Sequence, residues 1–408
     1  MTDTHPARRA PTALTSLTMF AATALTVTAL TMTASTAATG DSSGPGREPG
    51  HGRRPGGTQA ALEEIVRQGT PGVIAETRDG NRTWRGAAGV ADLGTRRPRS
   101  PGERFRVASM TKPFTATVIL KLEAAGRLSL GDSVERWLPG LVRGEGYHPE
   151  QITIRHLLNH TSGIFNYNDD EAFRARYAGD EFAKNRYTTI APRELVEIAL
   201  GHPAPFQPGE PGHWGYSDTN YILAGMIIER ASGHGYADEV GRQIIGPLGL
   251  RGTEVPGTKP TLPRPHARHY STLFEDGPDA KIRDVTELNP SVAWAAGQIV
   301  STTHDINTFM TRLLRGRVLE PAQQRELLAT VPVRGEDGHG GSEDRYGLGI
   351  RLFELAPGCQ VWGHGGMIPG SASRTAVSAD GRHALTMNRN GDWGAQELED
   401  AAVRAEFC

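Results

Sequence analysis

The sequence lacks the motifs with which proteins hold metal ions and nucleotides. Its 14 histidines form no His-Glu-x-x-His pattern and no Cys/His spacing of the kind that binds zinc. It contains neither Gly-x-x-x-x-Gly-Lys-Ser/Thr nor a strand-linked Gly-x-Gly-x-x-Gly, so nucleotide binding has no support. The formal net charge is −2 and no long run of like charges occurs, so no nucleic-acid partner is expected. We therefore predict an activity that needs no metal and no cofactor.

Cysteine is scarce, with Cys359 and Cys408 alone. In an exported protein an even number of cysteines permits a disulfide. A bond between them would join the end of the sequence to a strand-like segment near residue 360. It would close a loop of about 50 residues and contribute about 2–4 kcal/mol. The alternative is two free thiols.

Lysine is also rare, and arginine supplies most of the 44 basic residues. Only one of the lysines, Lys112, has a serine three residues before it, Ser109. Arginine does not lose its proton in proteins and cannot serve as a base. A lysine at this position is therefore suited to a role that arginine cannot fill. The lysines are Lys112, Lys121, Lys184, Lys259 and Lys281.

The stretch around Ser109 predicts the start of a helix. A short apolar lead-in ends at Ser109, and Pro113 stands where a first helical turn tolerates proline. Lys112 would then lie one turn from Ser109, and the N–H groups of the helix start would favour negative charge on the hydroxyl. Ser-x-x-Lys is typical of serine hydrolases without a Ser-His-Asp triad; the alternative is a surface lysine at an ordinary helix start. The helix should end at Gly126 and bury Phe114, Val118, Leu120, Leu122 and Ala125.

The N-terminal region predicts export. Arg8 and Arg9 precede an uncharged stretch, residues 13–34, and small residues at 34–38 offer a cleavage site. We expect residues 1–38 to be a signal peptide and the protein to be secreted. A membrane anchor is the alternative, since the stretch is nearly long enough to span a bilayer, although it is rich in threonine. Residues 39–57, rich in glycine and proline, should form a flexible linker.

Strand-like segments lie at both ends of the remaining sequence, with helical segments between them. Asp79-Gly80-Asn81 joins two strands as a hairpin, and strand-like segments recur from Tyr346 to residue 388 before a final helix at about 395–406. We predict an α+β fold in which one antiparallel sheet, flanked by terminal helices, is built from both ends and a mostly helical lobe is inserted. The domain would span 58–408, with an α/β part at about 58–140 and 290–408 and a helical lobe at about 141–289. Residues 164–190 should form a long surface excursion.

A second motif, Tyr216-Ser217-Asp218, precedes a predicted helix. Tyr216 could carry a proton if nearby cations lower its pKa from about 10. Asp218 is well placed to bind Lys112 or a substrate amide. The alternative is that Tyr216 packs in the core and Asp218 caps the helix.

A third motif, His364-Gly365-Gly366, lies between two apolar strands. Glycines there let the backbone run close to a substrate that pairs as an extra strand. His364 could assist protonation in the site. The same three residue types at 339–341 lie in a charged loop without a strand, and we exclude them.

The three motifs occur in the order and approximate spacing of a known family. Over residues 60–408 the sequence resembles the penicillin-recognising serine hydrolases, which include the serine-type D-alanyl-D-alanine carboxypeptidases and the class C β-lactamases. The similarity is closest to the secreted D,D-carboxypeptidases. The resemblance implies a β-lactamase/transpeptidase-like fold.

The resemblance also implies a role for each motif residue. Ser109 would be acylated, Lys112 would activate it, and Tyr216 would pass a proton to the leaving amine. The backbone N–H groups of Ser109 and Met367 would form the oxyanion hole. Arg351 would reach a substrate carboxylate, Trp294 would wall the site, and the two cysteines would form the family's C-terminal disulfide. The implied substrate-binding residues are Asp218, Trp294, Arg351, His364, Gly365, Gly366 and Met367.

Two positions depart from the family pattern. Asp218 stands where asparagine is usual, and an ionised aspartate cannot donate a hydrogen bond to a substrate carbonyl. Close to Lys112 it would also favour the charged ammonium, which works against Lys112 as a base. Gly365 stands where threonine is usual, which removes a hydroxyl that could bind a substrate carboxylate. Both changes weaken the case for strict D,D-carboxypeptidase specificity.

We predict a secreted, monomeric serine hydrolase similar to the D-alanyl-D-alanine carboxypeptidases, acting through an acyl-enzyme on Ser109. Its partners would be a small peptide or β-lactam substrate and, more broadly, cell-wall peptidoglycan. The alternatives are a β-lactamase or esterase of the same fold and a catalytically weak penicillin-binding protein.

Overall fold

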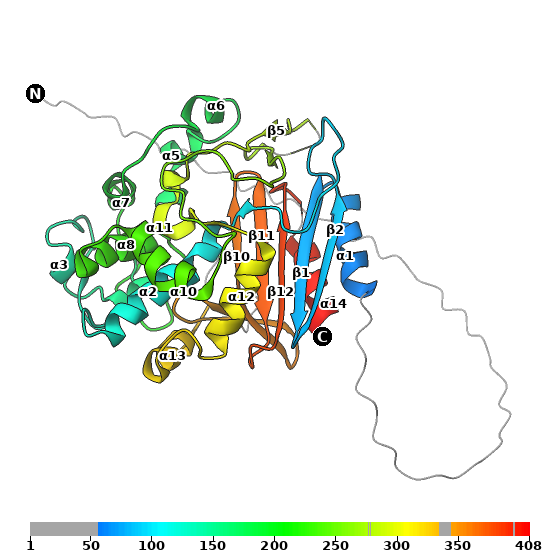
Figure 1. Ribbon diagram of the computed structural model, residues 1–408. Helices are drawn as coiled ribbons and strands as arrows, with labels where there is room; N and C mark the ends of the chain where they lie inside the picture. Colours follow the sequence, from blue (N-terminus) through cyan, green and yellow to red (C-terminus); the bar gives the residue numbers. More distant parts are fainter. Residues whose placement is uncertain (1–55, 276, 278, 334–343, 395) are drawn as a thin grey trace, which may run out of the picture. The chain divides into compact units, whose positions relative to one another are not determined.

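An eight-stranded antiparallel sheet in the order β2-β1-β12-β11-β10-β9-β8-β7 organises the described part of the protein (Figure 1). The structure is a computed structural model that describes residues 56–275, 277, 279–333, 344–394 and 396–408. The predicted signal peptide and nearly all of the predicted linker lie outside these residues. The strands are β1 (Gly72–Asp79), β2 (Arg82–Gly89), β7 (Val331–Pro332), β8 (Arg345–Tyr346), β9 (Arg351–Ala356), β10 (Cys359–Ile368), β11 (Ser371–Val377) and β12 (His383–Arg389).

Both ends of the described chain meet in this sheet, one strand in from its β2 edge. β1 pairs with β12, so that Val73 lies opposite Arg389. The predicted β1–β2 hairpin is present, and Gly80 in its turn has a φ of 58°, which favours glycine. The segment from Tyr346, expected as one strand, divides into β8 and β9, because a turn closes between Gly347 and Ile350 with a 2.8 Å hydrogen bond.

Two helices cover one face of the sheet. α1 (Gly56–Arg67) and α14 (Gln396–Phe407) lie behind it in the view of Figure 1. Leu62 of α1 and Val403 of α14 are fully buried in one apolar cluster with Leu385 of β12. α1 begins at Gly56, inside the segment expected to be linker, since its first turns already pack on the sheet.

α12 (Thr303–Leu314) packs on the opposite face and connects the sheet to the helical lobe. The sequence predicts a helix over 303–314 with Ser301 or Thr303 as its cap; the structure has these bounds, and Thr302 is the cap. Two short antiparallel ribbons are separate from the main sheet. They are formed by β3 (Phe105–Arg106) with β6 (Val300–Ser301) and by β4 (Tyr270–Ser271) with β5 (Arg283–Asp284). The lobe and its borders contain η1 (Ala108–Thr111), α2 (Lys112–Ala124), α3 (Val134–Trp137), α4 (Ile154–Leu158), η2 (Tyr167–Asp169), α5 (Glu171–Ala175), α6 (Glu181–Asn185), α7 (Pro192–Leu200), α8 (Asp218–Ser232), α9 (Tyr236–Val240), η3 (Gly241–Ile245), α10 (Gly246–Leu248), η4 (Pro290–Val292), α11 (Trp294–Gly297) and α13 (Pro321–Leu328).

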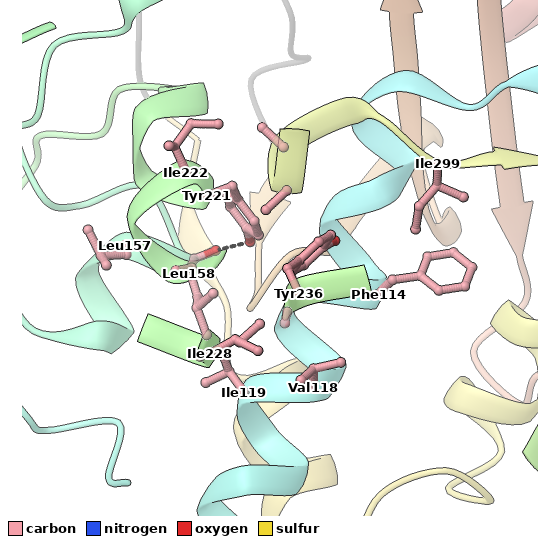
Figure 2. Packing of buried hydrophobic residues seen from close by; sticks show 14 of the residues in the cluster. Phe114, Val118, Ile119, Leu157, Leu158, Tyr221, Ile222, Ile228, Tyr236 and Ile299 are labelled. Atoms are coloured by element: carbon pink, nitrogen blue, oxygen red, sulfur yellow. Dashed lines mark hydrogen bonds between the residues drawn. The ribbon is translucent and has the colours of Figure 1, made fainter. Parts of the chain in front are cut away.

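α2 runs through the centre of the larger apolar cluster. Figure 2 shows Phe114, Val118 and Ile119 projecting from α2 in different directions within this cluster. Phe114 stacks on Phe309 of α12 with 3.9 Å between ring centroids. The buried residues of α2 lie on all sides of the helix and include Thr115 and Thr117, as in a helix enclosed by a core. The predicted amphipathic helix is therefore a core helix, and Ala125, expected to be buried, lies exposed beyond its end.

The segment 164–190, expected as a surface excursion, is anchored by aromatic side chains. Phe173, Tyr177 and Phe182 are all buried, and Tyr167 donates a hydrogen bond from its hydroxyl to the Val292 carbonyl at 2.9 Å. Short helical turns with no clear period carry these residues, which is why the polar sequence between them suggested a loop. Throughout the described residues, no helix combines the length and the apolar character needed to cross a bilayer.

The C-terminal disulfide should be a main support of α14. It joins Cys359, the first residue of β10, to Cys408, 49 positions later. Closing a loop of this length in the unfolded chain stabilises the fold by about 2–4 kcal/mol. We expect Cys408→Ser to lower the free energy of unfolding, measured in urea, by this amount. Reducing agent should destabilise the unmodified protein equally and leave the variant unchanged; a variant as stable as the oxidised protein would contradict the expectation.

Candidate active site

Ser109 is presented to a cavity by a strained turn. It follows β3 and lies in η1, one residue after Ala108, whose φ of 49° is in the left-handed region. Non-glycine residues adopt this conformation at a cost of about 1–3 kcal/mol, and such strain clusters at functional sites. The serine is half-buried and lines a cavity of about 590 Å³.

Lys112, the first residue of α2, is completely buried and points at Ser109. Its Nζ lies 3.0 Å from Ser109 Oγ, 2.5 Å from Asp218 Oδ1 and 3.1 Å from the Ala296 carbonyl oxygen. The three partners satisfy the three donors of an ammonium group. A buried ammonium requires such compensation, because an unpaired charge in the interior is strongly unfavourable. The structure thus joins the first motif to the second.

Tyr216 lies above this pair. Lys112 Nζ is 4.8 Å from the centre of the Tyr216 ring. Burial and, next, the negative charge of Asp218 raise the pKa of Tyr216 well above its usual value, against the opposing effect of its hydrogen bond with Ser109. The charge of Arg351 does lower this pKa, but burial and Asp218 outweigh it, so the condition that cations bring the pKa below about 10 is not met. Tyr216 keeps its proton at neutral pH, and its hydroxyl is a donor.

Asp218 is the first residue of α8, and its carboxylate is bound on both sides. Oδ1 accepts from Lys112, and Oδ2 accepts from Asn168 Nδ2 at 2.6 Å. Its backbone N–H donates to Asn166 Oδ1 at 3.1 Å. The alternative in which Asp218 caps α8 fails, because Ser217 occupies that position. Asn166 and Asn168 escaped sequence reasoning; their one signal was two asparagines at i and i+2 after the turn at Gly163.

The C-terminal half of β10, beyond the residues that pair with β9, forms one wall of the site. β9 pairs with β10 only as far as Gly363, opposite Arg351, whereas β11 pairs with β10 on to Ile368. In the described part of the chain, residues 364–368 therefore have a strand neighbour on one side only. Such an edge can accept an extended substrate as an additional strand. Met367, on this edge, is 58% exposed.

The two glycines of the third motif face opposite directions. A Cβ on Gly366 would lie 2.2 Å from the Val107 carbonyl oxygen and 3.1 Å from Ser109 N. Glycine is thus required for β10 to approach the turn that carries the serine. A Cβ on Gly365 would face Arg374, whose Nη1 is 3.7 Å away, which is ordinary contact. The assignment of the Ser109 and Met367 N–H groups to an oxyanion hole stays a prediction.

His364 has both ring nitrogens engaged within the protein. Nδ1 lies 2.5 Å from the Gly365 carbonyl oxygen and must donate to it, so Nε2 accepts from the Tyr346 hydroxyl at 2.8 Å. Burial, followed by the charge of Lys112, lowers the pKa of His364 to about 3. A neutral histidine with this arrangement has no proton for a substrate. The suggested role in protonation is therefore wrong, and His364 instead anchors Tyr346.

Arg351 and Trp294 differ in their relation to the cavity. Arg351 lines it and lies 3.0 Å from Asp344 Oδ2. Trp294 turns the other way: its ring covers Gly225 of α8 and lies 5.4 Å from the Tyr236 ring. It is not among the described residues that line the cavity, so the prediction that it walls the site is wrong. Glycine at 225 leaves room for the indole, which explains its inward orientation.

Side chains from the C-terminal helix complete the far side of the cavity. Glu399 of α14 forms an ion pair with Arg389 at 2.6 Å, and both line the cavity. Arg374 pairs with Asp400 at 2.8 Å and lies 3.8 Å above the Phe353 ring. Sequence reasoning missed these residues because they come together only through sheet pairing and the packing of α14 on the sheet. Within the described ranges, no group of three or more His, Cys, Asp or Glu side chains is arranged to hold a metal ion.

Comparison with known proteins agrees with this geometry. The family model described as Beta-lactamase matches residues 58–407. The chain belongs to this family of penicillin-recognising serine hydrolases. The chain is also 28% identical to penicillin-binding protein 4* of Bacillus subtilis over 342 residues, which cover 82% of the chain and 71% of that protein.

Two solved structures are similar over most of the chain. A D-stereospecific amidohydrolase from Streptomyces sp. is 45% identical, with a TM-score of 0.80 over 86% of this chain and 98% of that one. The D-amino acid amidase of Ochrobactrum anthropi SV3, complexed with L-phenylalanine amide, is 29% identical, with a TM-score of 0.73 over 86% and 97%. The predicted α+β, β-lactamase-like fold is confirmed.

Replacing Gly366 should push β10 away from the turn that carries Ser109. We expect Gly366→Ala to lower kcat/KM for a p-nitrophenyl ester about 100-fold or more, because displacing reacting groups by about 1 Å costs this much. Gly365→Ala is the matched comparison, since its Cβ meets only ordinary contacts, and its loss should be below about tenfold. Circular dichroism should show both variants folded. Equal losses in the two variants would contradict the close approach of β10 to Ser109.

Three buried histidines predict a loss of stability in mild acid. Burial lowers the pKa of His160 and His269 well below the usual value and that of His364 to about 3, whereas an unfolded histidine titrates near 6.5. Below that pH the unfolded chain binds protons that the folded chain does not, so stability present above about pH 6.5 is lost as the pH falls. Each histidine contributes up to about 1.4 kcal/mol per pH unit.

Urea unfolding near pH 7 and near pH 5 measures this loss. His269→Asn should reduce the dependence of the unfolding free energy on pH by the contribution of one histidine. His148, whose side chain is 48% exposed, provides the matched control, and His148→Asn should keep the original dependence. A free energy of unfolding that is the same at both pH values would rule out buried neutral histidines.

Proposed function

We propose that the protein is a serine amidohydrolase that cleaves an amide, peptide or ester bond at the carbonyl of a D-amino acid carrying a free amino group. The observation that carries the proposal is Asp218, whose carboxylate lies between Lys112 and the cavity. The likeness to a D-stereospecific amidohydrolase and to a D-amino acid amidase supports it. The reaction proceeds through an acyl-enzyme on Ser109.

Proton transfer follows the short contacts around Lys112. Lys112 first passes a proton to Asp218 Oδ1 across 2.5 Å, which leaves a neutral amine with a lone pair. As Ser109 Oγ bonds to the substrate carbonyl carbon, its proton passes to this amine, 3.0 Å away. Tyr216 then donates its phenolic proton to the leaving nitrogen and regains one from Lys112, which takes back the proton held by Asp218. The C–N bond breaks, the amine departs neutral, and water hydrolyses the resulting ester.

The charges around the cavity favour a substrate ammonium over a substrate carboxylate. The Asp218 side chain is 16% exposed and can accept a further hydrogen bond from an ammonium group. On the other side, Arg351 already lies 3.0 Å from Asp344, and Gly365 offers no hydroxyl. We therefore place a D-aminoacyl amide or ester ahead of the D,D-carboxypeptidase substrate that the sequence suggested.

The carboxypeptidase reading remains the second candidate, because Arg351 does line the cavity. It differs from the first in the position of the charged group: a carboxylate on the leaving residue instead of an ammonium on the acyl residue. Secretion also stays a proposal, carried by the N-terminal sequence features described above, and contact with peptidoglycan stays one implied by the family resemblance. A monomeric state stays a proposal without a sequence feature behind it.

A substrate panel separates these activities. D-phenylalanine amide and its p-nitroanilide should be hydrolysed at least about tenfold faster than the L-enantiomers. N-acetylation of the D-substrate should reduce kcat/KM about 10- to 100-fold, the value of a charge-assisted hydrogen bond of about 1.5–3 kcal/mol. Asp218→Asn should abolish this preference for the free amine, and Ser109→Ala should remove all turnover.

The decisive measurement is the ratio of kcat/KM for the free-amine substrate to that for the acetylated substrate. Asp218→Asn also alters the surroundings of Lys112 and so lowers both values, but this effect cancels in the ratio. An unchanged ratio would refute the role of Asp218. Faster cleavage of an N-acyl-D-alanyl-D-alanine peptide would establish the carboxypeptidase. Penicillin consumed without a stable adduct would establish a β-lactamase. No turnover of any substrate would leave a catalytically weak penicillin-binding protein.

A further inference from the structure

We propose that His160 is the residue that positions Tyr216 for proton transfer. The inference rests on the proposed function, in which Tyr216 donates a proton to the leaving group. His160 follows α4 and is completely buried. The sequence motifs gave it no role, and it does not line the cavity in the described part of the chain. It acts through Tyr216 and not on the substrate.

Hydrogen bonds accepted by His160 fix the backbone on both sides of Tyr216. The carbonyl oxygen of His160 accepts from the Gly215 N–H at 3.1 Å. Its ring Nδ1 accepts from the Ser217 N–H at 3.2 Å. Since Gly215 and Ser217 are the two neighbours of Tyr216, a single residue holds both ends of the segment that carries the phenol.

The imidazole ring also supports the phenol ring directly. The ring centroids of His160 and Tyr216 are 4.4 Å apart with an angle of 33° between the planes. Tyr346 contacts the imidazole edge-on at 4.9 Å. The phenol therefore rests on a ring that is itself held in place. This fixes the direction of the Tyr216 hydroxyl, which is bonded to Ser109.

The imidazole remains neutral, as this role requires. Nδ1 faces two donors, Ser217 N–H and Asn220 Nδ2, the latter at 3.2 Å, so Nδ1 carries no hydrogen and Nε2 carries the proton. Lys112, Arg351 and the neutral His364 face the ring from neighbouring elements, and the positive charges of Lys112 and Arg351 add to burial in lowering the pKa of His160. An acceptor at Nδ1 is therefore present throughout the neutral pH range.

Two unfavourable features are retained at this residue. His160 has a φ of 63°, in the left-handed region. Its Nε2 is buried with no hydrogen-bond partner among the described residues. A conformation of this kind persists only where the surrounding structure determines it strongly, and it is concentrated at functional sites. Packing alone would be served by an apolar side chain with an ordinary backbone conformation.

The experiment compares an amide with an activated ester of the same D-amino acid. A p-nitrophenolate leaves without a proton, whereas an amine needs one, so loss of a correctly placed Tyr216 should affect the amide selectively. General acid catalysis contributes about 100- to 10,000-fold. We expect His160→Phe, which removes the Nδ1 acceptor, to lower kcat for the amide about 10- to 100-fold, with less than about a threefold change for the ester. Tyr216→Phe should show the same selective loss, at least as large.

His160→Asn is the second variant, because asparagine tolerates the left-handed conformation and can offer an acceptor oxygen near the position of Nδ1. It should recover part of the amide activity that His160→Phe loses. His269→Phe is the matched control: His269 is also fully buried and also has an unpartnered Nε2, but its Nδ1 faces the Gly370 carbonyl. Its amide-to-ester ratio should equal that of the unmodified protein.

The outcomes separate the two proposals. A selective loss in Tyr216→Phe without one in either folded His160 variant would overturn the role of His160 and leave the proposed function standing. If the unmodified protein cleaves neither substrate, the proposed function fails. In that case a crystal structure of a His160 variant tests the positioning role without an activity measurement. The Tyr216 hydroxyl should have moved out of hydrogen-bonding distance of Ser109 Oγ. An unmoved Tyr216 would overturn the inference.

Discussion

The site depends on one buried positive charge. Lys112 is inaccessible to solvent, and its ammonium group is held by Ser109, Asp218 and the Ala296 carbonyl. These partners belong to η1, α8 and α11, which are distant in sequence. A charge removed from water must be compensated at short distance, so these elements cannot shift independently without a large cost. The need to compensate the buried charge of Lys112 therefore holds these elements together and also fixes the positions of the reacting groups.

Local sequence patterns predicted much of the fold. A helix pattern that starts at Pro192 predicts α7, a helix pattern over 303–314 predicts α12, and Asp79-Gly80-Asn81 predicts the β1–β2 hairpin. The same reasoning failed for 164–190, where buried aromatic residues are spaced irregularly. Periodicity reports burial only when an element is long enough to repeat, and α5 and α6 have five residues each.

The residues of the candidate site were also predictable only where a local sequence pattern revealed them. Ser109 and Lys112 were visible because the chemistry fixes their spacing within one turn of the chain. Asn168 and Glu399 were not visible, because they reach the site through tertiary contacts and have no fixed distance in sequence from the motifs. Trp294 was misplaced for a related reason: an aromatic side chain beside a motif can face either way, and the absence of a side chain at Gly225 decides the direction.

The pairing of β1 with β12 also has a consequence for how the chain reaches this structure. Thr70 and Arg389, 319 positions apart, are joined by a 3.4 Å hydrogen bond beside that pair. Contacts of such sequence separation require a large loss of chain entropy before they provide stabilisation, so they form slowly. Until they form, β12 has an unpaired edge, which invites association with other chains. The joining of the two ends of the domain is thus the step at which folding competes with aggregation.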